Sequence, residues 1–219
     1  MESKNTPYKG YDFSPLEVFE WIKHGTFEYI LAKNWLTTTD FETFKTTFEE
    51  RFLQNFIQVK SLISNKLDEG NISFVLLIVS LYEAFLAVGV CEEYALQYTE
   101  ESVCWPIFPF MQEGTEKMPD NAENPFKSLV LSSKTREKEY FGDSFDFERP
   151  IDDEFGYVLR IKKCLFHETL KILHRVELQN IVCRIDLGWI KGIKPYKVRP
   201  VTFTSGNICQ MWFMREEKL

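Results

Sequence analysis

The segment ISFVLLIVSLYEAFLAVGV, residues 72–90, is a long apolar run that fixes the centre of the fold. Its length would nearly span a bilayer. However, it contains Ser80 and Glu83, no basic cluster follows it, and Asn71 offers an N-cap at its start. We therefore interpret residues 72–89 as a helix that is buried on most sides, and we predict no membrane span.

The residues before this segment also carry helix signals. Ser14 and Pro15 predict a helix start, because serine favours the N-cap and proline the first helical position. Gly25 predicts the end of this helix. A second, short helix is expected over residues 27–35.

A long amphipathic helix is expected next, with Asp40 as its N-cap. Its signal is an apolar stripe at spacings of three or four residues, formed by Phe44, Phe48, Phe52, Phe56, Val59 and Ile63. Residues 68–70 are expected to end it. After the buried helix, residues 91–101 predict a further and more polar helix.

The second half of the chain has a different pattern. It predicts two short strands, then two helices, then two more strands, over residues 145–149, 156–161, 165–175, 177–193, 198–204 and 208–214. Pro150 and an acidic turn separate the first two strands, and Ser205, Gly206 and Asn207 form the turn of the closing hairpin.

The predicted fold class is therefore α+β. It has a helical N-terminal part over residues 1–103 and a long connecting loop over residues 104–138, with a short helix near residues 125–132. The β-β-α-α-β-β part over residues 139–219 has a small antiparallel sheet packed by helices. We expect the three parts to form one compact domain.

The composition narrows the function classes. The 219 residues include 20 phenylalanines and carry a net charge of −7. An acidic chain is a poor partner for nucleic acid or anionic membranes, so we expect a small-molecule substrate; a homo-oligomer is compatible with these features. The five cysteines match no disulfide framework and the N-terminus has no apolar signal region, so we predict a cytoplasmic protein with reduced thiols.

Reactive side chains gather in KKCLFHETLKILHRVELQNIVCRID, residues 162–186. Cys164 should lie where a strand ends and a helix begins, and a helix N-terminus lowers a thiol pKa. His167 and Glu168 follow three and four residues later, on the same helical face. The imidazole could carry a proton, and Glu168 could orient it or act as an acid. The alternative is that Cys164 is a buried packing residue.

Cys183 and Asp186 also share a helical face. An aspartate within an apolar run needs a partner or points into a site. Substrate binding is expected to involve Cys209 on the last strand, and Trp189 and Trp212 are aromatic candidates for the pocket wall. The candidate clamps for a substrate carboxylate are Arg160, Arg184 and Arg199.

Two chemistries fit these groups. In one, a cysteine thiolate attacks an electrophilic carbon, with His167 and Asp186 or Glu168 moving protons. In the other, Cys164, His167, Cys183 and Cys209 hold a zinc ion that activates water. Since no C-x-x-C pair is present, we rank the zinc site second and predict no cofactor.

The runs KKCLFHETLK, VCRIDLGW and IKPYKVRPVTFTSGNICQMWF resemble the L-2-amino-thiazoline-4-carboxylate hydrolase family, over residues 45–215. The C-terminal part is similar, more distantly, to the 4-vinyl-reductase domain, a small-ligand-binding module. Met211 and Trp212 stand where the hydrolase family commonly shows a charged residue.

This resemblance implies a hydrolase that acts on a C–N or C–S bond of a small heterocycle. Two alternatives remain at this point. One is a natural-product biosynthetic enzyme of the same fold that forms or rearranges rings. The other is a module that binds a small ligand without catalysis.

Overall fold

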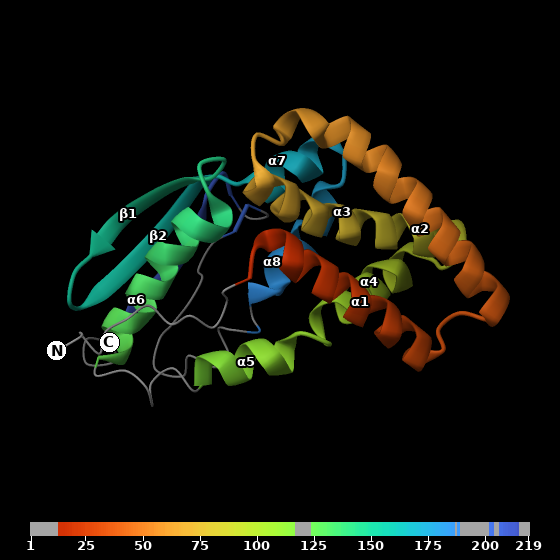
Figure 1. The fold of residues 1–219 in the computed structure, drawn as a ribbon, viewed down its shortest axis with the longest axis horizontal. Helices are drawn as coiled ribbons and strands as arrows, with labels where there is room; N and C mark the ends of the chain where they lie inside the picture. Colours follow the sequence, from red (N-terminus) through yellow and green to blue (C-terminus); the bar gives the residue numbers. More distant parts are fainter. Residues whose placement is uncertain (1–12, 117–123, 187, 189–201, 204–205, 215–219) are drawn as a thin grey trace.

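The computed structural model describes residues 13–116, 124–186, 188, 202–203 and 206–214. Its fold is α+β, as predicted: a small antiparallel sheet lies at one end of the molecule and helices fill the rest (Figure 1). The helical elements are α1 (Pro15–Lys33), α2 (Thr38–Val59), η1 (Lys60–Leu62), α3 (Lys66–Ala87), α4 (Glu92–Cys104), α5 (Phe108–Glu116), α6 (Pro125–Arg136), η3 (Glu137–Phe141), α7 (Leu165–Ile172), η4 (Val176–Leu178) and α8 (Gln179–Arg184).

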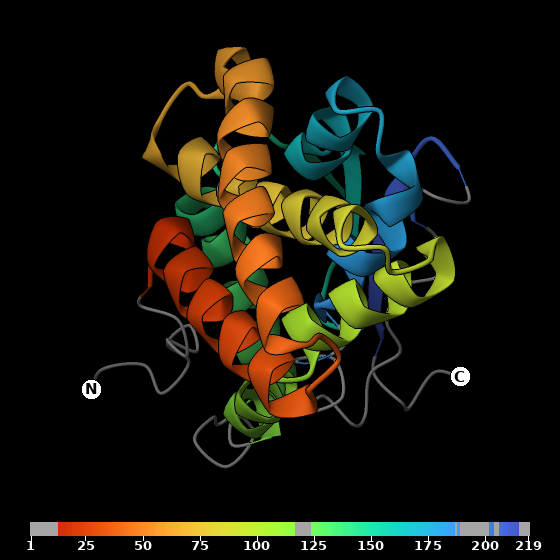
Figure 2. The same ribbon diagram turned by 90° about the vertical axis from the view of Figure 1, so that its right-hand side faces the viewer.

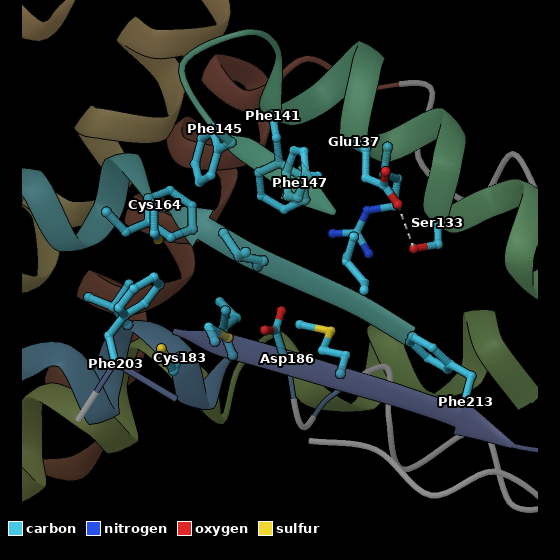
Figure 3. Close-up of a pocket in the computed structure, with 18 of the residues that line it drawn as sticks. Ser133, Glu137, Phe141, Phe145, Phe147, Cys164, Cys183, Asp186, Phe203 and Phe213 are labelled. Atoms are coloured by element: carbon cyan, nitrogen blue, oxygen red, sulfur yellow. Dashed lines mark hydrogen bonds between the residues drawn. The ribbon is translucent and has the colours of Figure 1, made fainter. Parts of the chain in front are cut away.

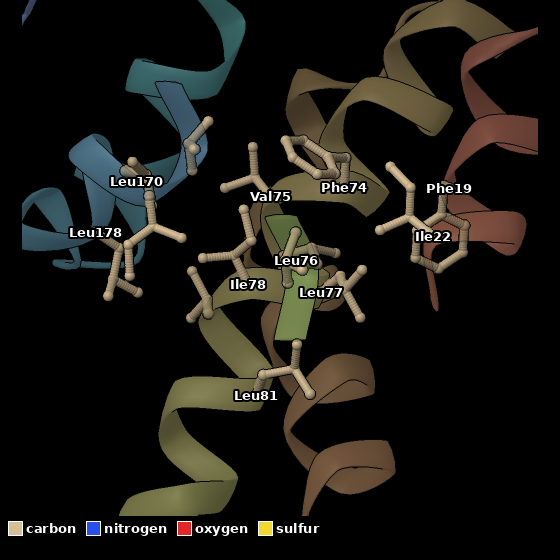
Figure 4. Close-up of a cluster of buried hydrophobic side chains, with 14 of the residues drawn as sticks. Phe19, Ile22, Phe74, Val75, Leu76, Leu77, Ile78, Leu81, Leu170 and Leu178 are labelled. Atoms are coloured by element: carbon tan, nitrogen blue, oxygen red, sulfur yellow. The ribbon is translucent and has the colours of Figure 1, made fainter. Parts of the chain in front are cut away.

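Helix α3 is the centre of the core, which confirms the interpretation of the apolar segment. It is apolar and long enough to cross a membrane, but 83% of its most apolar window is buried inside the protein. Phe19 and Ile22 of α1 pack on one side of it, and Leu170 and Leu178 lie on the other (Figure 4). Figure 2 shows α3 crossing between α2 and the group formed by α7 and α8.

The bounds of the first helices differ from the predicted ones. Helix α1 begins at the capping box of Ser14, as expected, but it continues through Gly25 to Lys33. A glycine inside a helix costs only about 1 kcal/mol relative to alanine. The buried residues Phe19, Ile22 and Ile30 lie on both sides of Gly25 and form one continuous stripe, and this packing outweighs the glycine.

The N-caps of α2 and α3 also lie elsewhere. Thr37 caps α2, and its Oγ1 accepts a hydrogen bond from the backbone N–H of Asp40. Asn65 caps α3 in the same way. Asn71 is therefore inside α3, and residues 68–70, which were expected to end the preceding helix, belong to its first turns.

The segment predicted as a long loop contains two helices: α6, which matches the short helix expected near residues 125–132, and α5, which was not expected. Their prolines stand in the first turns, where the missing N–H is tolerated: Pro109 is the second residue of α5, and Pro125 the first of α6. Asn124 caps α6 by accepting from the N–H of Lys127. Helix α6 then passes into one turn of π-helix, η3, a geometry that is frequent at functional sites.

The predicted hairpin of the second half is confirmed. Strands β1 (Asp146–Asp152) and β2 (Gly156–Lys163) pair antiparallel. The turn is held by Asp153, whose Oδ1 accepts from the N–H groups of Phe155 and Gly156. Strand β3 (Cys209–Met214) pairs antiparallel with β2, which gives the order β1-β2-β3.

Two expected elements fall partly outside the described residues. The strand over residues 198–204 lies there except for Thr202 and Phe203. The helix expected over residues 177–193 appears as η4 and α8, which end at Arg184, and residues 189–193 are outside the described part of the chain.

A pair of glycine substitutions tests the packing of α1 on α3. In Gly70→Ala, the new Cβ would lie 2.3 Å from the backbone N of Leu16 and 2.5 Å from the carbonyl carbon of Pro15. Because backbone atoms cannot move aside easily, we expect a loss of about 2 kcal/mol in the free energy of unfolding.

Gly25→Ala is the matched control, since the same change in α1 meets only the Cβ of Pro106, at 3.5 Å. It should raise the free energy of unfolding by about 0.5–1 kcal/mol. Urea titrations followed by circular dichroism would measure both values. Equal losses in the two variants would contradict the close approach of the two helices.

Candidate active site

A cavity of about 110 Å³ lies between the sheet, the α6–η3 segment and α8 (Figure 3). Six phenylalanines line it: Phe141, Phe145, Phe147, Phe166, Phe203 and Phe213. Alternate residues of a strand share one face, so β2 contributes Leu159 and Ile161 and β3 contributes Cys209, Met211 and Phe213. The cavity is thus predominantly apolar, as small-molecule sites usually are.

The aromatic end of the cavity is held by ring contacts. Phe145 and Phe147 stack with their planes 4° apart, and Phe141 lies 5.0 Å from Phe145 between ring centroids. Phe166 meets the edge of Phe145 at 5.3 Å. Such contacts add to the burial of the rings and fix their positions, so this wall is preformed.

Cys164 lies where the sequence placed it, as the N-cap of α7 at the end of β2. Its pKa differs from the expectation. Burial raises the pKa of this thiol well above its ordinary value, because desolvation outweighs the backbone N–H groups of His167 and Phe166 that favour the thiolate. Cys209 is buried as well. The structure therefore favours the packing interpretation of Cys164.

Cys183 stands in a different environment. Its side chain is half-buried, it lines the cavity, and its Sγ accepts a hydrogen bond from Nε2 of Gln179 at 3.1 Å. A hydrogen bond to sulfur favours negative charge there. Of the three cavity thiols, Cys183 is the one that is only half-buried and accepts a side-chain hydrogen bond from Gln179.

Gln179 connects His167 with this thiol through two hydrogen-bond contacts. The His167 Nδ1 and the Gln179 Oε1 lie 2.8 Å apart, and the imidazole stacks on Phe203 at 4.8 Å. With the proton on Nδ1, the imidazole donates to the amide oxygen and turns the amide NH₂ group toward Cys183. His167 itself is not among the cavity-lining residues.

Gln179 is the residue that the sequence interpretation missed. It is buried, with 1% of its surface exposed, and it stands four residues before Cys183. Residues at this spacing meet on one face of a helix. The spacing of four residues from Cys183 was available in the sequence, but the burial of Gln179 was not.

The remaining predicted residues divide into three groups. Asp186 lines the cavity beside Cys183 (Figure 3). Glu168 pairs with Lys171 at 3.3 Å and is not among the lining residues. Arg184 donates from Nε to Glu100 of α4 at 2.7 Å, away from the cavity. The helix that carries Cys183 is anchored by this last contact, so Arg184 has a structural partner where a substrate clamp was expected.

The other proposed clamps and aromatic residues lie outside the cavity wall or outside the described residues. Arg160 binds Gln210 at 3.1 Å and pairs with Glu148 at 3.3 Å. Trp212 is 43% exposed. Trp189 and Arg199 fall in the part of the chain that is not described.

A second polar group lies on the opposite wall of the cavity (Figure 3). The Glu137 carboxylate is 4% exposed and accepts hydrogen bonds from Tyr157 and Arg149 and, at 3.3 Å, from Ser133. Burial and the contact with Glu137 raise the pKa of the Tyr157 hydroxyl, so it remains protonated and donates. This network was not predicted, because residues 104–138 were interpreted as a loop.

Arg136 is the cation of the cavity wall among the described lining residues. It ends α6, and its guanidinium lies 5.6 Å from the ring centre of Tyr140 and 5.8 Å from that of Phe141. Contact with aromatic faces fixes the plane of a guanidinium. Arg136 thus lines the cavity, whereas Arg160 and Arg184 do not, and Arg199 lies outside the described residues.

The zinc alternative requires Cys164, His167, Cys183 and Cys209 to converge. Among the described residues, which include all four, no group of three or more Cys, His, Asp or Glu side chains has a metal-binding arrangement. His167 is instead engaged with Gln179. The predicted zinc set is therefore not assembled.

One of the comparisons with known proteins identifies a family. A family model described as L-2-amino-thiazoline-4-carboxylic acid hydrolase matches residues 70–213. This range runs from α3 to the end of the sheet and includes every residue that lines the cavity. No curated protein and no solved structure matches the chain.

Proposed function

The chain belongs to the L-2-amino-thiazoline-4-carboxylic acid hydrolase family, and on this premise we propose that it is a small-molecule hydrolase that opens a 2-amino-thiazoline-type ring. The single observation that carries this proposal is the placement of Cys183. Its sulfur lines an apolar cavity and accepts a hydrogen bond from a buried amide that His167 orients.

The first chemical step is addition of the thiol to the ring. The carboxylate of Asp186 takes the proton of Cys183, and the thiolate forms a bond to carbon 2, which is electrophilic because it is bonded to two nitrogens and a sulfur. The electron pair of the C=N bond moves to the ring nitrogen, which takes the proton from Asp186. The product is a tetrahedral carbon bonded to Cys183.

The second step opens the ring and the third releases the product. The bond from carbon 2 to the ring sulfur breaks, and a nitrogen lone pair re-forms the C=N bond. The proton that this nitrogen then loses goes to the released sulfur, which becomes a free thiol. Water adds to the same carbon as the C=N electron pair returns to nitrogen, and that nitrogen takes one water proton. The carbonyl group forms as the bond to Cys183 breaks, and the second water proton goes to the Cys183 sulfur. The sum is substrate plus water giving an N-carbamoyl amino acid with a thiol.

The walls of the cavity support the binding that this reaction needs. Arg136 can pair with the ring carboxylate, in the two-pronged geometry that guanidinium groups favour. The phenylalanines exclude bulk water, so the charge interactions inside act at a lower effective dielectric constant than in solution. Cys164 and Cys209 are buried lining groups, and burial keeps the Cys164 thiol protonated at neutral pH.

Selective alkylation and turnover test this proposal together. Cys91 is the exposed thiol, so the experiment uses Cys91→Ser as background. Near pH 7, iodoacetamide should modify Cys183 before Cys104, Cys164 and Cys209, as read by peptide mass spectrometry. L-2-amino-thiazoline-4-carboxylate should slow this reaction, and its turnover should release thiol detectable with a disulfide reagent. Modification of the buried thiols at the same rate as Cys183 would argue against this nucleophile.

A further inference from the structure

A second cavity, of about 70 Å³, borders the first. The two cavities share part of their walls, formed by Arg136, Phe141, Phe166, Ile185 and Asp186. The guanidinium and the carboxylate at this boundary are the charged groups that the proposed reaction uses for binding and proton transfer. A ligand held at Arg136 and Asp186 therefore lies next to both cavities at once.

Apart from Tyr140, the rest of the second cavity is apolar and comes from the N-terminal half. Val18, Trp21 and Ile22 of α1 line it, together with Phe74 of α3 and Met111 of α5. Trp21 is 44% exposed, whereas Phe74 and Met111 are 8% and 6% exposed. The second cavity thus runs from a partly exposed rim at α1 to the buried wall it shares with the first.

The origin of these walls matters for specificity. Every residue that lines the first cavity lies within the family match, which covers residues 70–213. The α1 residues of the second cavity precede the match. The reaction chamber is therefore built from the matched segment, while one wall of the adjoining cavity is contributed by sequence outside it.

We propose that the second cavity binds an apolar substituent of the substrate. This inference rests on the proposed function and specifies its substrate class: a 2-amino-thiazoline-type carboxylic acid that carries an aryl or branched alkyl group beside its carboxylate. The ring occupies the first cavity, with carbon 2 toward Cys183. The carboxylate meets Arg136 at the boundary, and the substituent enters the space between Phe74, Val18 and Met111.

The test compares two substrates, L-2-amino-thiazoline-4-carboxylate and its 5-phenyl derivative. Burial of an apolar group in a fitting pocket raises kcat/KM roughly 10- to 100-fold, and we expect this increase for the phenyl compound. In Val18→Trp the indole fills the second cavity, so the ratio of the two kcat/KM values should fall to about one. Val18→Phe and Val18→Leu give a graded series in case the tryptophan variant does not fold.

Leu53→Trp is the matched control, because it makes the same kind of enlargement at a side chain of α2 that is 62% exposed. It should keep the ratio of the unmodified protein. A ratio of one or less in the unmodified protein, or a ratio that every folded Val18 variant leaves unchanged, would overturn the inference.

A binding measurement separates this inference from the proposed hydrolysis. If neither compound is turned over, calorimetric titration with 3-phenylpropionate and propionate still applies. Tighter binding of 3-phenylpropionate, lost in Val18→Trp and retained in Leu53→Trp, would support the apolar subsite although the hydrolysis had failed. Equal affinities of the two acids would overturn the subsite itself.

Discussion

Cys183→Ala is expected to lower the kcat for L-2-amino-thiazoline-4-carboxylate by at least about 1,000-fold, because removal of a covalent nucleophile has effects of this size or larger. No other cavity thiol can take its place. Cys164 and Cys209 are buried, and burial raises the pKa of Cys164, so that at neutral pH it remains a protonated thiol. The measurement is initial-rate kinetics with detection of the released thiol.

Cys164→Ala and Cys209→Ala are the matched controls, since each removes one thiol from the same cavity. We expect kcat within about threefold of the unmodified protein, with a stability loss of about 1 kcal/mol from the lost packing. If Cys164→Ala abolished turnover and Cys183→Ala did not, the assignment of the nucleophile would be reversed.

A smaller loss of activity is expected when Gln179, which lies between His167 and Cys183, is replaced. Gln179→Met keeps the shape of the side chain but removes both the amide that donates to Cys183 and the oxygen that faces His167. If the amide positions and stabilises the thiolate, kcat should fall about 10- to 100-fold with KM nearly unchanged, and the rise of activity with pH should move to higher pH. A merely structural role would leave the pH profile in place.

Local patterns predicted much of the fold. The apolar run around Leu77 and Ile78 specified the core helix, and alternating residues around Val158 specified the hairpin partner. The predicted ends of the helices were less accurate. Gly25 is typical of a helix C-terminus, but α1 continues through it because residues on both sides of it are buried. Asp40 is typical of an N-cap, but the hydroxyl of Thr37 caps α2 instead. Capping energies of about 1 kcal/mol are easily outweighed by packing.

The candidate site was predicted in part. The pairing of Cys183 with Asp186 followed from helical spacing, and both line the cavity. The low pKa expected for Cys164 was wrong, because a position at a helix start does not show how deeply tertiary packing buries the thiol. Gln179 was missed because its spacing from Cys183 shows neither its burial nor its contact with His167. Arg136 and Glu137 were missed because residues 104–138 were interpreted as a loop, and because Glu137 meets its partners on the sheet.

The largest stability effect is expected at Glu137, in Glu137→Ala. This carboxylate ties η3 to the sheet, through Arg149 of β1 and Tyr157 of β2. Removing one member of a buried charged group leaves the partner charges and hydroxyls without compensation, at a cost of roughly 3–5 kcal/mol. We expect about 4 kcal/mol here, because Tyr157 is fully buried and its hydroxyl would have to be desolvated without the acceptor it now has.

Glu148→Ala on strand β1 is the matched control for this loss. Glu148 also pairs with basic groups, Arg160 and Lys162, but its carboxylate is exposed. Exposed ion pairs contribute little, because water and salt screen them, so this variant should unfold at nearly the same urea concentration as the unmodified protein. Similar losses in both variants would mean that the Glu137 network is no more buried than a surface pair.

A third variant, Glu137→Gln, identifies the charge as the cause. The stabilising form of Glu137 is the carboxylate, since it accepts from Arg149 and Tyr157 and a protonated acid would have to give up one of these bonds. Glu137→Gln retains the shape and one acceptor but not the charge, so its loss should lie between those of the unmodified protein and Glu137→Ala. Because η3 also supplies Phe141 to the cavity wall, the order of the three proteins in urea stability should recur in their turnover. Stability and activity that varied independently would instead separate this network from the site.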